Sequence, residues 1–154
     1  MDNLDTKKKY IQNLKSERDL MLIFNYETVL ELKLFIIREK KMSQKCLSKL
    51  IFEEENEKIR ACAVRKLSYQ YVIAKIALED KSGLVRKNAT ELITNQDILK
   101  KIALNDQDCL VRAAAVKKIK IQSTLETIAL KDESSLVRKA ASTILLNLSN
   151  LNIE

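Results

Sequence analysis

The stretch IALKDESSLVRKAAS, residues 128–142, has two close copies earlier in the same chain. They are IALEDKSGLVRKNAT, residues 76–90, and IALNDQDCLVRAAAV, residues 102–116. The starting positions 76, 102 and 128 lie 26 residues apart, and each copy contains Leu-Val-Arg at the same place. A fixed period of this length indicates a repeat architecture, in which each repeat is one small supersecondary unit.

The composition favours an all-helical protein. The 154 residues include no proline, one glycine and no tryptophan, so the residues that usually end strands and form tight hairpins are nearly missing. The chain is 46% hydrophobic and 32% charged, as in ordinary soluble domains. Apolar runs such as residues 34–37 are far shorter than the roughly 20 residues of a membrane-spanning helix. We expect one soluble domain over residues 1–154, without membrane contact or secretory signal, in the cytoplasm.

The seventh position of each repeat predicts the start of a helix. It holds Asn56, Ser82, Asp108 and Ser134. Their short side chains can accept a hydrogen bond from the free N–H groups of a helix's first turn. Apolar side chains then recur four residues apart, as at Val111, Ala115 and Ile119, which is the spacing of one helix face.

A second, shorter helix is expected before this one, as in residues 97–104, where the apolar residues are Ile98, Leu99, Ile102 and Ala103. Helices of about 8 to 11 residues are not stable alone in water, so they must be stabilised by packing on neighbouring repeats. The fourteenth position is always alanine, which lets neighbouring helices approach closely: Ala63, Ala89, Ala115 and Ala141. The sequence therefore predicts a right-handed α-solenoid of about five stacked helical hairpins.

The period also sets the expected boundaries. Four repeats cover residues 50–75, 76–101, 102–127 and 128–153, and residues 24–49 form a degenerate fifth repeat in which Gln44 aligns with Gln70, Gln96 and Gln122. In front of it, residues 1–23 are expected to form an amino-terminal capping helix. Its apolar residues, up to Phe24, are Tyr10, Ile11, Leu14 and Met21.

At these residues the chain resembles the HEAT and armadillo class of helical repeats, especially short bacterial HEAT-like repeats of the pattern D-x-x-x-x-V-R-x-x-A. The pattern occurs as Asp80, Val85, Arg86 and Ala89 and again 26 and 52 residues later, with a weaker copy from Glu54 to Ala63. HEAT repeats usually run to about 40 residues. The shorter, proline-free repeat leaves open a 3₁₀ segment in place of the first helix.

The resemblance implies a structural role for one acidic and one basic position. The acid and the arginine six positions later would form a polar ladder between successive repeats, next to a Leu-Val pair that we expect to be buried. Its members are Glu54, Asp80, Asp106, Asp132, Arg60, Arg86, Arg112 and Arg138. A guanidinium group suits this task because it can bind a carboxylate and carbonyl groups together. The alternative is an arginine row that binds phosphate or carboxylate ligands.

Charge is distributed unevenly within the repeats. The fourth to eighth positions contain ten acids and two bases, whereas the ninth to twentieth contain twelve bases and Glu91 as the only acid. This bias complements helix dipoles. It can equally form a basic strip for an acidic partner, and the candidate residues are Arg65, Lys66, Lys87, Lys117, Lys118 and Lys139.

Binding is the expected function, without catalysis. Cys46, Cys62 and Cys109 have no C-x-x-C spacing and the chain has no histidine, so we expect reduced thiols and neither a metal site nor a cofactor. Few aromatic side chains accompany the bases, which favours an acidic protein or peptide partner over nucleic acid. Nucleic acid remains the alternative, since the resembling class includes DNA glycosylases, although their catalytic carboxylate pocket is not recognisable here.

The carboxyl-terminal segment is unusually apolar. Residues 140–153 carry no charge, and the core pattern continues through Leu146, Leu148, Leu151 and Ile153. Solenoids usually end in a polar face. Either this last half-repeat folds back as its own cap, or it forms a homodimer interface.

Overall fold

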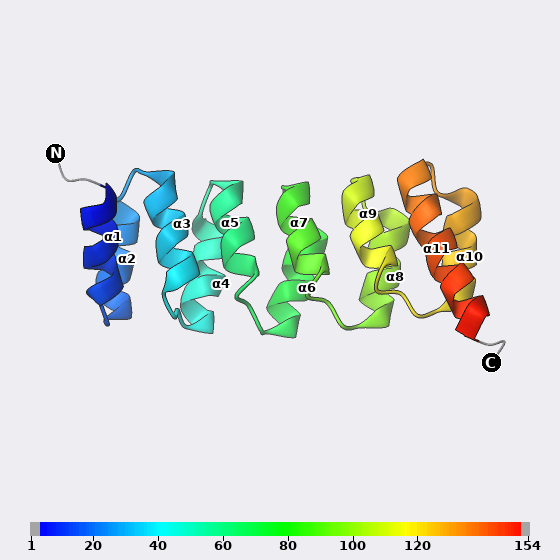
Figure 1. Cartoon of the computed structure of the whole chain (residues 1–154), viewed down its shortest axis with the longest axis horizontal. Coiled ribbons are helices and arrows are strands. Elements are labelled where there is room, and N and C mark those ends of the chain that lie inside the picture. Colours follow the sequence, from blue (N-terminus) through cyan, green and yellow to red (C-terminus); the bar gives the residue numbers. More distant parts are fainter. Residues whose placement is uncertain (1–3, 152–154) are drawn as a thin grey trace. The chain divides into compact units, whose positions relative to one another are not determined.

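The computed structural model describes residues 4–151 and has eleven α-helices, and no strand, within that range (Figure 1). The all-α prediction is confirmed. The chain groups into two compact units, residues 1–67 and residues 68–154, which we call unit 1 and unit 2 and describe separately.

Four helices of ten residues each begin at glutamines spaced 26 residues apart. They are α4 (Gln44–Glu53) in unit 1 and α6 (Gln70–Glu79), α8 (Gln96–Asn105) and α10 (Gln122–Lys131) in unit 2. We call them the A helices. Leu99, Ile102 and Ala103 of α8 are buried as predicted, and Ile98 is half-buried. Because all four segments are α-helical, the 3₁₀ alternative is wrong.

A second helix follows each A helix after a short turn. These B helices are α5 (Glu57–Val64) in unit 1 and α7 (Gly83–Thr90), α9 (Cys109–Val116) and α11 (Ser135–Leu151) in unit 2. Each begins directly after a predicted cap residue. Asn56 Oδ1 accepts a hydrogen bond from the Lys58 N–H at 2.9 Å, and Asp108 Oδ1 accepts one from the Leu110 N–H at 2.8 Å. The Ser82 side chain makes no such bond.

Unit 2 is built from two layers of helices. Each A helix packs on the B helix that follows it, giving the pairs α6–α7, α8–α9 and α10–α11. The B helices pack on one another in the order α7, α9, α11, and the A helices in the order α6, α8, α10 (Figure 1). Ala89, Ala115 and Ala141 are fully buried within the B helices, as expected for positions where helices approach closely.

Unit 1 departs from the prediction at its start. Residues 1–23 were expected to form one capping helix, but two helices occur here, α1 (Leu4–Asn13) and α2 (Glu17–Tyr26). Ser16 causes the break, since its hydroxyl accepts a hydrogen bond from the Asp19 N–H at 3.3 Å and caps α2. Tyr10, one of the apolar residues assigned to that capping helix, is 61% exposed. Both α1 and α2 pack on α3 (Leu30–Glu39), which packs on α5.

The last B helix is longer than the others. α11 has 17 residues, whereas α5, α7 and α9 have 8 each, and it continues without a break to Leu151. A half-repeat that folds back is therefore not present in the described part of this segment. Leu146 is 64% exposed and Leu148 is half-buried. The side chain of Leu151 and all of Ile153 lie outside the described residues.

Candidate functional site

The arginines of the Leu-Val-Arg triplets connect successive helix pairs of unit 2. Arg86 holds both carboxylate oxygens of Asp106, with Nε to Oδ2 at 2.8 Å and Nη2 to Oδ1 at 2.9 Å. Its Nη1 donates to the main-chain oxygen of Asp80 at 2.9 Å. The guanidinium therefore links the turn before its own B helix to the turn of the next repeat.

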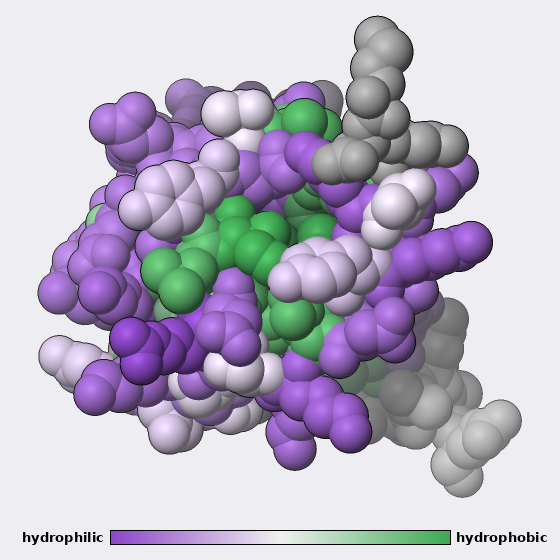
Figure 2. Space-filling view, turned by 90° about the vertical axis from the view of Figure 1, so that its left-hand side faces the viewer, coloured by the Kyte–Doolittle hydropathy of each residue, from purple (hydrophilic) through white to green (hydrophobic). Residues whose placement is uncertain are grey.

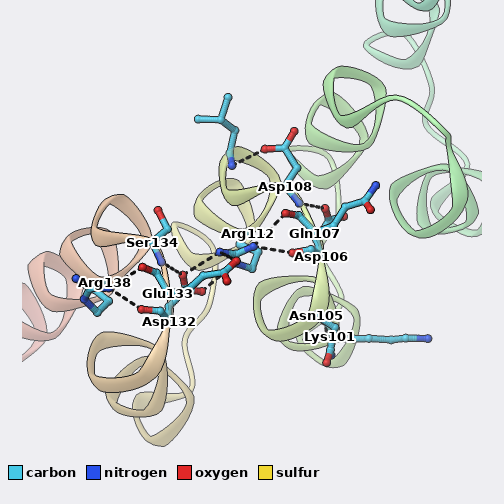
Figure 3. A network of polar contacts seen from close by, with 11 residues as sticks. Lys101, Asn105, Asp106, Gln107, Asp108, Arg112, Asp132, Glu133, Ser134 and Arg138 are labelled. Atoms are coloured by element: carbon cyan, nitrogen blue, oxygen red, sulfur yellow. Dashed lines mark hydrogen bonds and ion pairs between the residues drawn. The ribbon is translucent and has the colours of Figure 1, made fainter.

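Arg112 repeats this geometry one repeat later (Figure 3). Its Nε and Nη2 donate to Asp132 at 2.9 and 3.0 Å, and its Nη1 donates to the Asp106 carbonyl at 2.8 Å. Burial opposes ionisation of Asp132, but hydrogen bonds from Arg112 and the Ser134 N–H outweigh it and lower the pKa of the carboxyl. The hydrogen bond to Asp132 likewise raises the pKa of Arg112.

The ladder exists, with a different pairing from the one expected. An arginine does not bind the carboxylate six residues before it; it binds the main-chain oxygen there and the carboxylate 20 residues after it. The acid has two tasks, since Asp106 Oδ1 also accepts from the Asp108 N–H at 2.9 Å and so fixes its own turn. Burial and these partners occupy Arg86 and Arg112, so the row offers little to a ligand.

The two outer arginines of the ladder also donate to main-chain carbonyls of the turn before their own B helix. Arg60 Nη1 donates to the carbonyls of Glu54 and Glu55 at 3.1 and 2.7 Å. Arg138 Nη1 donates to those of Asp132 and Glu133 at 2.7 and 2.9 Å. In the part of the chain that the structure describes, Arg138 makes no ion pair.

Lysines take the place of arginine in the first half of unit 1. Lys7 on α1 lies 3.3 Å from Glu27, and Lys33 on α3 lies 3.5 Å from Glu54. Each acid also fixes the turn before a helix, because Glu27 accepts from the Val29 N–H and Glu54 from the Asn56 N–H. Sequence reasoning missed these rungs because Lys33 stands one position before the arginine column.

Two residues of the predicted basic strip are engaged at helix ends. Lys66 Nζ donates to the carbonyls of Arg38 and Lys40, and Lys118 Nζ donates to the Glu91 carbonyl. Burial lowers the pKa of Lys118. Negative carbonyl ends of helices favour such cations. Lys66 therefore links the end of α5 to the end of α3, and Lys118 links the end of α9 to the end of α7.

The other members of the strip face solvent. Arg65, Lys117 and Lys139 are exposed, and Lys87 lies 3.9 Å from Glu91, one helical turn away. An exposed pair at this distance contributes only about 0.3 to 0.5 kcal/mol. These four cations are therefore available to an external partner.

The B-helix surface of unit 2 also exposes a row of leucines. Leu84, Leu110 and Leu136 are 43%, 51% and 48% exposed, whereas the valines that follow them are fully buried. The expectation of a buried Leu-Val pair thus holds for valine only. Each leucine lies in the first turn of its B helix and points away from the core.

A groove of about 380 Å³ runs beside these leucines. We call it the α9 groove. Its lining residues come from α7, α9, α11 and the turns after α7 and α9: Lys87, Glu91, Leu110, Ala113, Ala114, Lys117, Lys118, Leu136 and Ala140. The groove thus combines apolar leucine and alanine side chains with the basic side chains of three lysines.

Unit 1 has surface features of its own. Its side at the left of Figure 1, formed by α1 and α2, shows an apolar area surrounded by polar residues (Figure 2). The large exposed side chains of these helices include Leu22 and Tyr26. A cavity of about 600 Å³ lies between α2 and α4, with charges of both signs, and contains Cys46. Burial and the nearby Glu17 raise the pKa of this free thiol, which makes it a poor nucleophile.

Within the described residues there is no group of three histidine, cysteine or acidic side chains that could hold a metal ion. The helices of that range are also too short or too polar to cross a membrane. Comparison of the chain with protein-family models, with curated proteins and with solved structures gives no match.

Proposed function

We propose that this protein is a non-catalytic scaffold that binds an acidic protein through its B-helix surface. We further propose that residues 1–154 form one HEAT-like, right-handed α-solenoid of about five hairpins, acting in the cytoplasm. The layered A and B helices of unit 2 support the solenoid, as do the equivalent rungs of unit 1. The free thiols of its three cysteines fit a reducing compartment.

The α9 groove is the observation that carries this proposal. Exposed leucines beside exposed lysines form a surface that is apolar in the centre and charged at the rim, as is usual for protein interfaces.

The repeats themselves supply the variant that tests the proposal. Lys117 can be replaced by glutamate, which the preceding repeat holds at this position as Glu91, and Lys87 and Lys139 by alanine, the residue at Ala61 and Ala113. Because each new residue already occurs in an equivalent place, the fold should be kept. Lys118 stays unchanged, since it binds a helix end.

The measurement is capture of partners from nuclease-treated lysate on immobilised protein, followed by titration of each captured protein. We expect a partner that resists nuclease and whose association with the triple variant Lys87→Ala/Lys117→Glu/Lys139→Ala is slowed, because exposed charges act mainly on the association rate. Equal binding of wild type and variant would count against the B-helix surface.

The nucleic-acid alternative makes a separate prediction. It requires sub-micromolar binding to duplex or single strands that weakens by orders of magnitude between about 50 and 200 mM salt. A gel-shift titration with this outcome, reduced in the same triple variant, would replace the protein partner with a nucleic acid.

A further inference from the structure

We infer that the α9 groove receives an α-helical segment of the partner, one whose exposed face carries apolar side chains and, towards one end, carboxylates. The inference rests on the proposed function and identifies the part of the B-helix surface that makes the contact and the kind of segment that fits it.

The groove follows the axis of α9. Leu110, Ala113 and Ala114 of α9 line it, followed by Lys117 directly after the helix, and residues spaced i, i+3, i+4 and i+7 lie along one side of a helix. The neighbouring B helices form its walls, since α7 and α11 both pack on α9. A ligand that fills this space therefore lies along α9, between two helices.

Ala113 creates the hollow. The equivalent positions of the preceding and following repeats hold the long side chains of Lys87 and Lys139. Ala113, at the same position of the repeat, has a side chain of only one carbon and leaves space between these two lysines. Small side chains allow a further helix to approach to about 8 to 10 Å between axes, so the floor at Ala113 and Ala114 admits one.

The backbone N–H and C=O groups of the bound segment must form their hydrogen bonds within that segment. The described B helices of unit 2 bond their own backbone groups and offer no strand edge. An extended ligand would bury N–H and C=O groups against leucine and alanine, at a cost of about 1 to 3 kcal/mol for each unpaired group. A helix bonds these groups itself, so it can present side chains alone to the groove.

The two ends of the groove differ in charge, which determines the side chains that the bound helix must present at each end. Leu110 and Leu136 lie in the first turns of α9 and α11, whereas Lys87 and Lys117 lie at the opposite ends of their helices. The groove contains three lysines and one glutamate, which is a net of two positive charges. Apolar residues of the occupant therefore face the leucines, and its carboxylates face the lysines.

A phosphate backbone fits this groove less well. It could bind the lysines but would leave two half-exposed leucines uncovered. The residues that line the groove include no aromatic side chain on which a base could stack. The combination of leucine, alanine and lysine thus favours an amphipathic peptide.

The test begins with a selection. Random 14-residue peptides displayed on phage are panned against the full chain, and enriched peptides are synthesised and titrated by fluorescence anisotropy. We expect apolar residues at i, i+3 or i+4 and i+7 together with at least two carboxylates. A central proline should abolish binding, because proline breaks a helix.

Two variants place the peptide in the groove. Ala113→Lys fills the hollow with the residue found at Lys87 and Lys139, and Leu110→Lys introduces the residue found at Lys58. Each should weaken peptide binding by about tenfold or more, since loss of a buried leucine contact is worth at least about 1.5 kcal/mol. Lys101→Glu on α8, in the other layer, is the matched control and should leave affinity unchanged. Circular dichroism checks that each variant is folded.

The outcomes separate the two proposals. Enriched peptides that are basic or rich in proline, or that bind Ala113→Lys as well as wild type, overturn the groove assignment. If such peptides still lose affinity for the triple lysine variant of the B-helix surface, the proposed function stands without the groove. A selection that yields no binding peptide counts against both.

Discussion

Arg112 illustrates how one side chain determines the connection between repeats. Its guanidinium group donates hydrogen bonds to Asp132 and to the Asp106 carbonyl of its own repeat, and its side chain is only 5% exposed. The Asp132 side chain is 8% exposed, so both charges are largely removed from water. A paired charge of this kind adds little net stability compared with an apolar pair, but breaking the pair leaves the partner buried and unpaired.

Replacing Arg112 by alanine should therefore lower the free energy of unfolding by about 2 to 4 kcal/mol, because it strands Asp132 and the Asp106 carbonyl. The stranded acid is Asp132 rather than Asp106, which Arg86 still holds. Urea denaturation measures the change. The exposed Lys117→Ala is the control and should shift stability by less than about 0.5 kcal/mol. If Arg112→Ala kept wild-type stability, the structural role of the arginine would be wrong, and the alternative of an arginine row that binds phosphate or carboxylate ligands would be favoured.

At the scale of the element, glutamine at the start of an A helix fixes the end of the paired B helix. Gln96 Nε2 donates to the Lys118 carbonyl at 3.1 Å, and its Oε1 accepts from the Lys120 N–H at 2.9 Å. Gln44 and Gln70 make the first of these bonds in their own repeats. Gln122 instead bonds Glu126 within α10, since α11 continues past the place where the other B helices end.

This difference provides a matched pair of substitutions. Gln96→Ala removes two hydrogen bonds to the end of α9 and should cost about 1 to 2 kcal/mol of unfolding free energy. Gln122→Ala removes one exposed contact within a helix and should cost no more than about 0.5 kcal/mol. Both are read from urea denaturation, with hydrogen exchange of the turn after α9 as a local probe. Equal losses would mean that the two bonds from Gln96 to the end of α9 contribute no more to stability than the single exposed contact of Gln122.

The elements show how far the sequence could predict this structure. Starts of the A and B helices were predictable because caps and apolar spacing are local signals repeated every 26 residues. Ends of the B helices were not, since the spacing carried the helix of the third repeat to Ile119, whereas α9 ends at Val116. The partner of Arg112 was not, because the choice between two acids depends on how repeats stack. The basic strip followed from charge alone, whereas the α9 groove depends on Leu110 turning outward from a Leu-Val pair, which spacing alone does not reveal.

On the scale of the whole molecule, apolar side chains remain exposed outside the α9 groove. Leu146 on α11 is 64% exposed and Tyr26 on α2 is 85% exposed. The position after Ala141 partly compensates, since exposed Ser142 stands where Val64, Thr90 and Val116 are fully buried in the other repeats. A polar residue such as Ser142 is typical of the outer face of a terminal repeat. An exposed leucine such as Leu146 is not.

A homodimer through this segment, one of the two alternatives for it, can be tested directly. Wild-type protein should sediment as a dimer at micromolar concentration, and Leu146→Glu should shift it to monomer without loss of helix, because exposed leucine clusters commonly mark association. Leu104→Glu, at a leucine on α8 that is 43% exposed, serves as the control and should remain dimeric. A wild-type monomer at high micromolar concentration would eliminate this interface.

The direction of the arginine rungs bears on how such a chain can lengthen. Every rung of unit 2 reaches forward, from an arginine to an acid 20 residues later. A second copy of residues 96–121 inserted after the first would bring one acid for the arginine before it and one arginine for the acid after it. No existing residue would need to change, and Asp106, Arg112 and Asp132 would each keep a partner in a rung. The rungs therefore allow the chain to lengthen by tandem duplication of a repeat. The residues that line the groove take no part in the rungs, so they can diverge in each new copy.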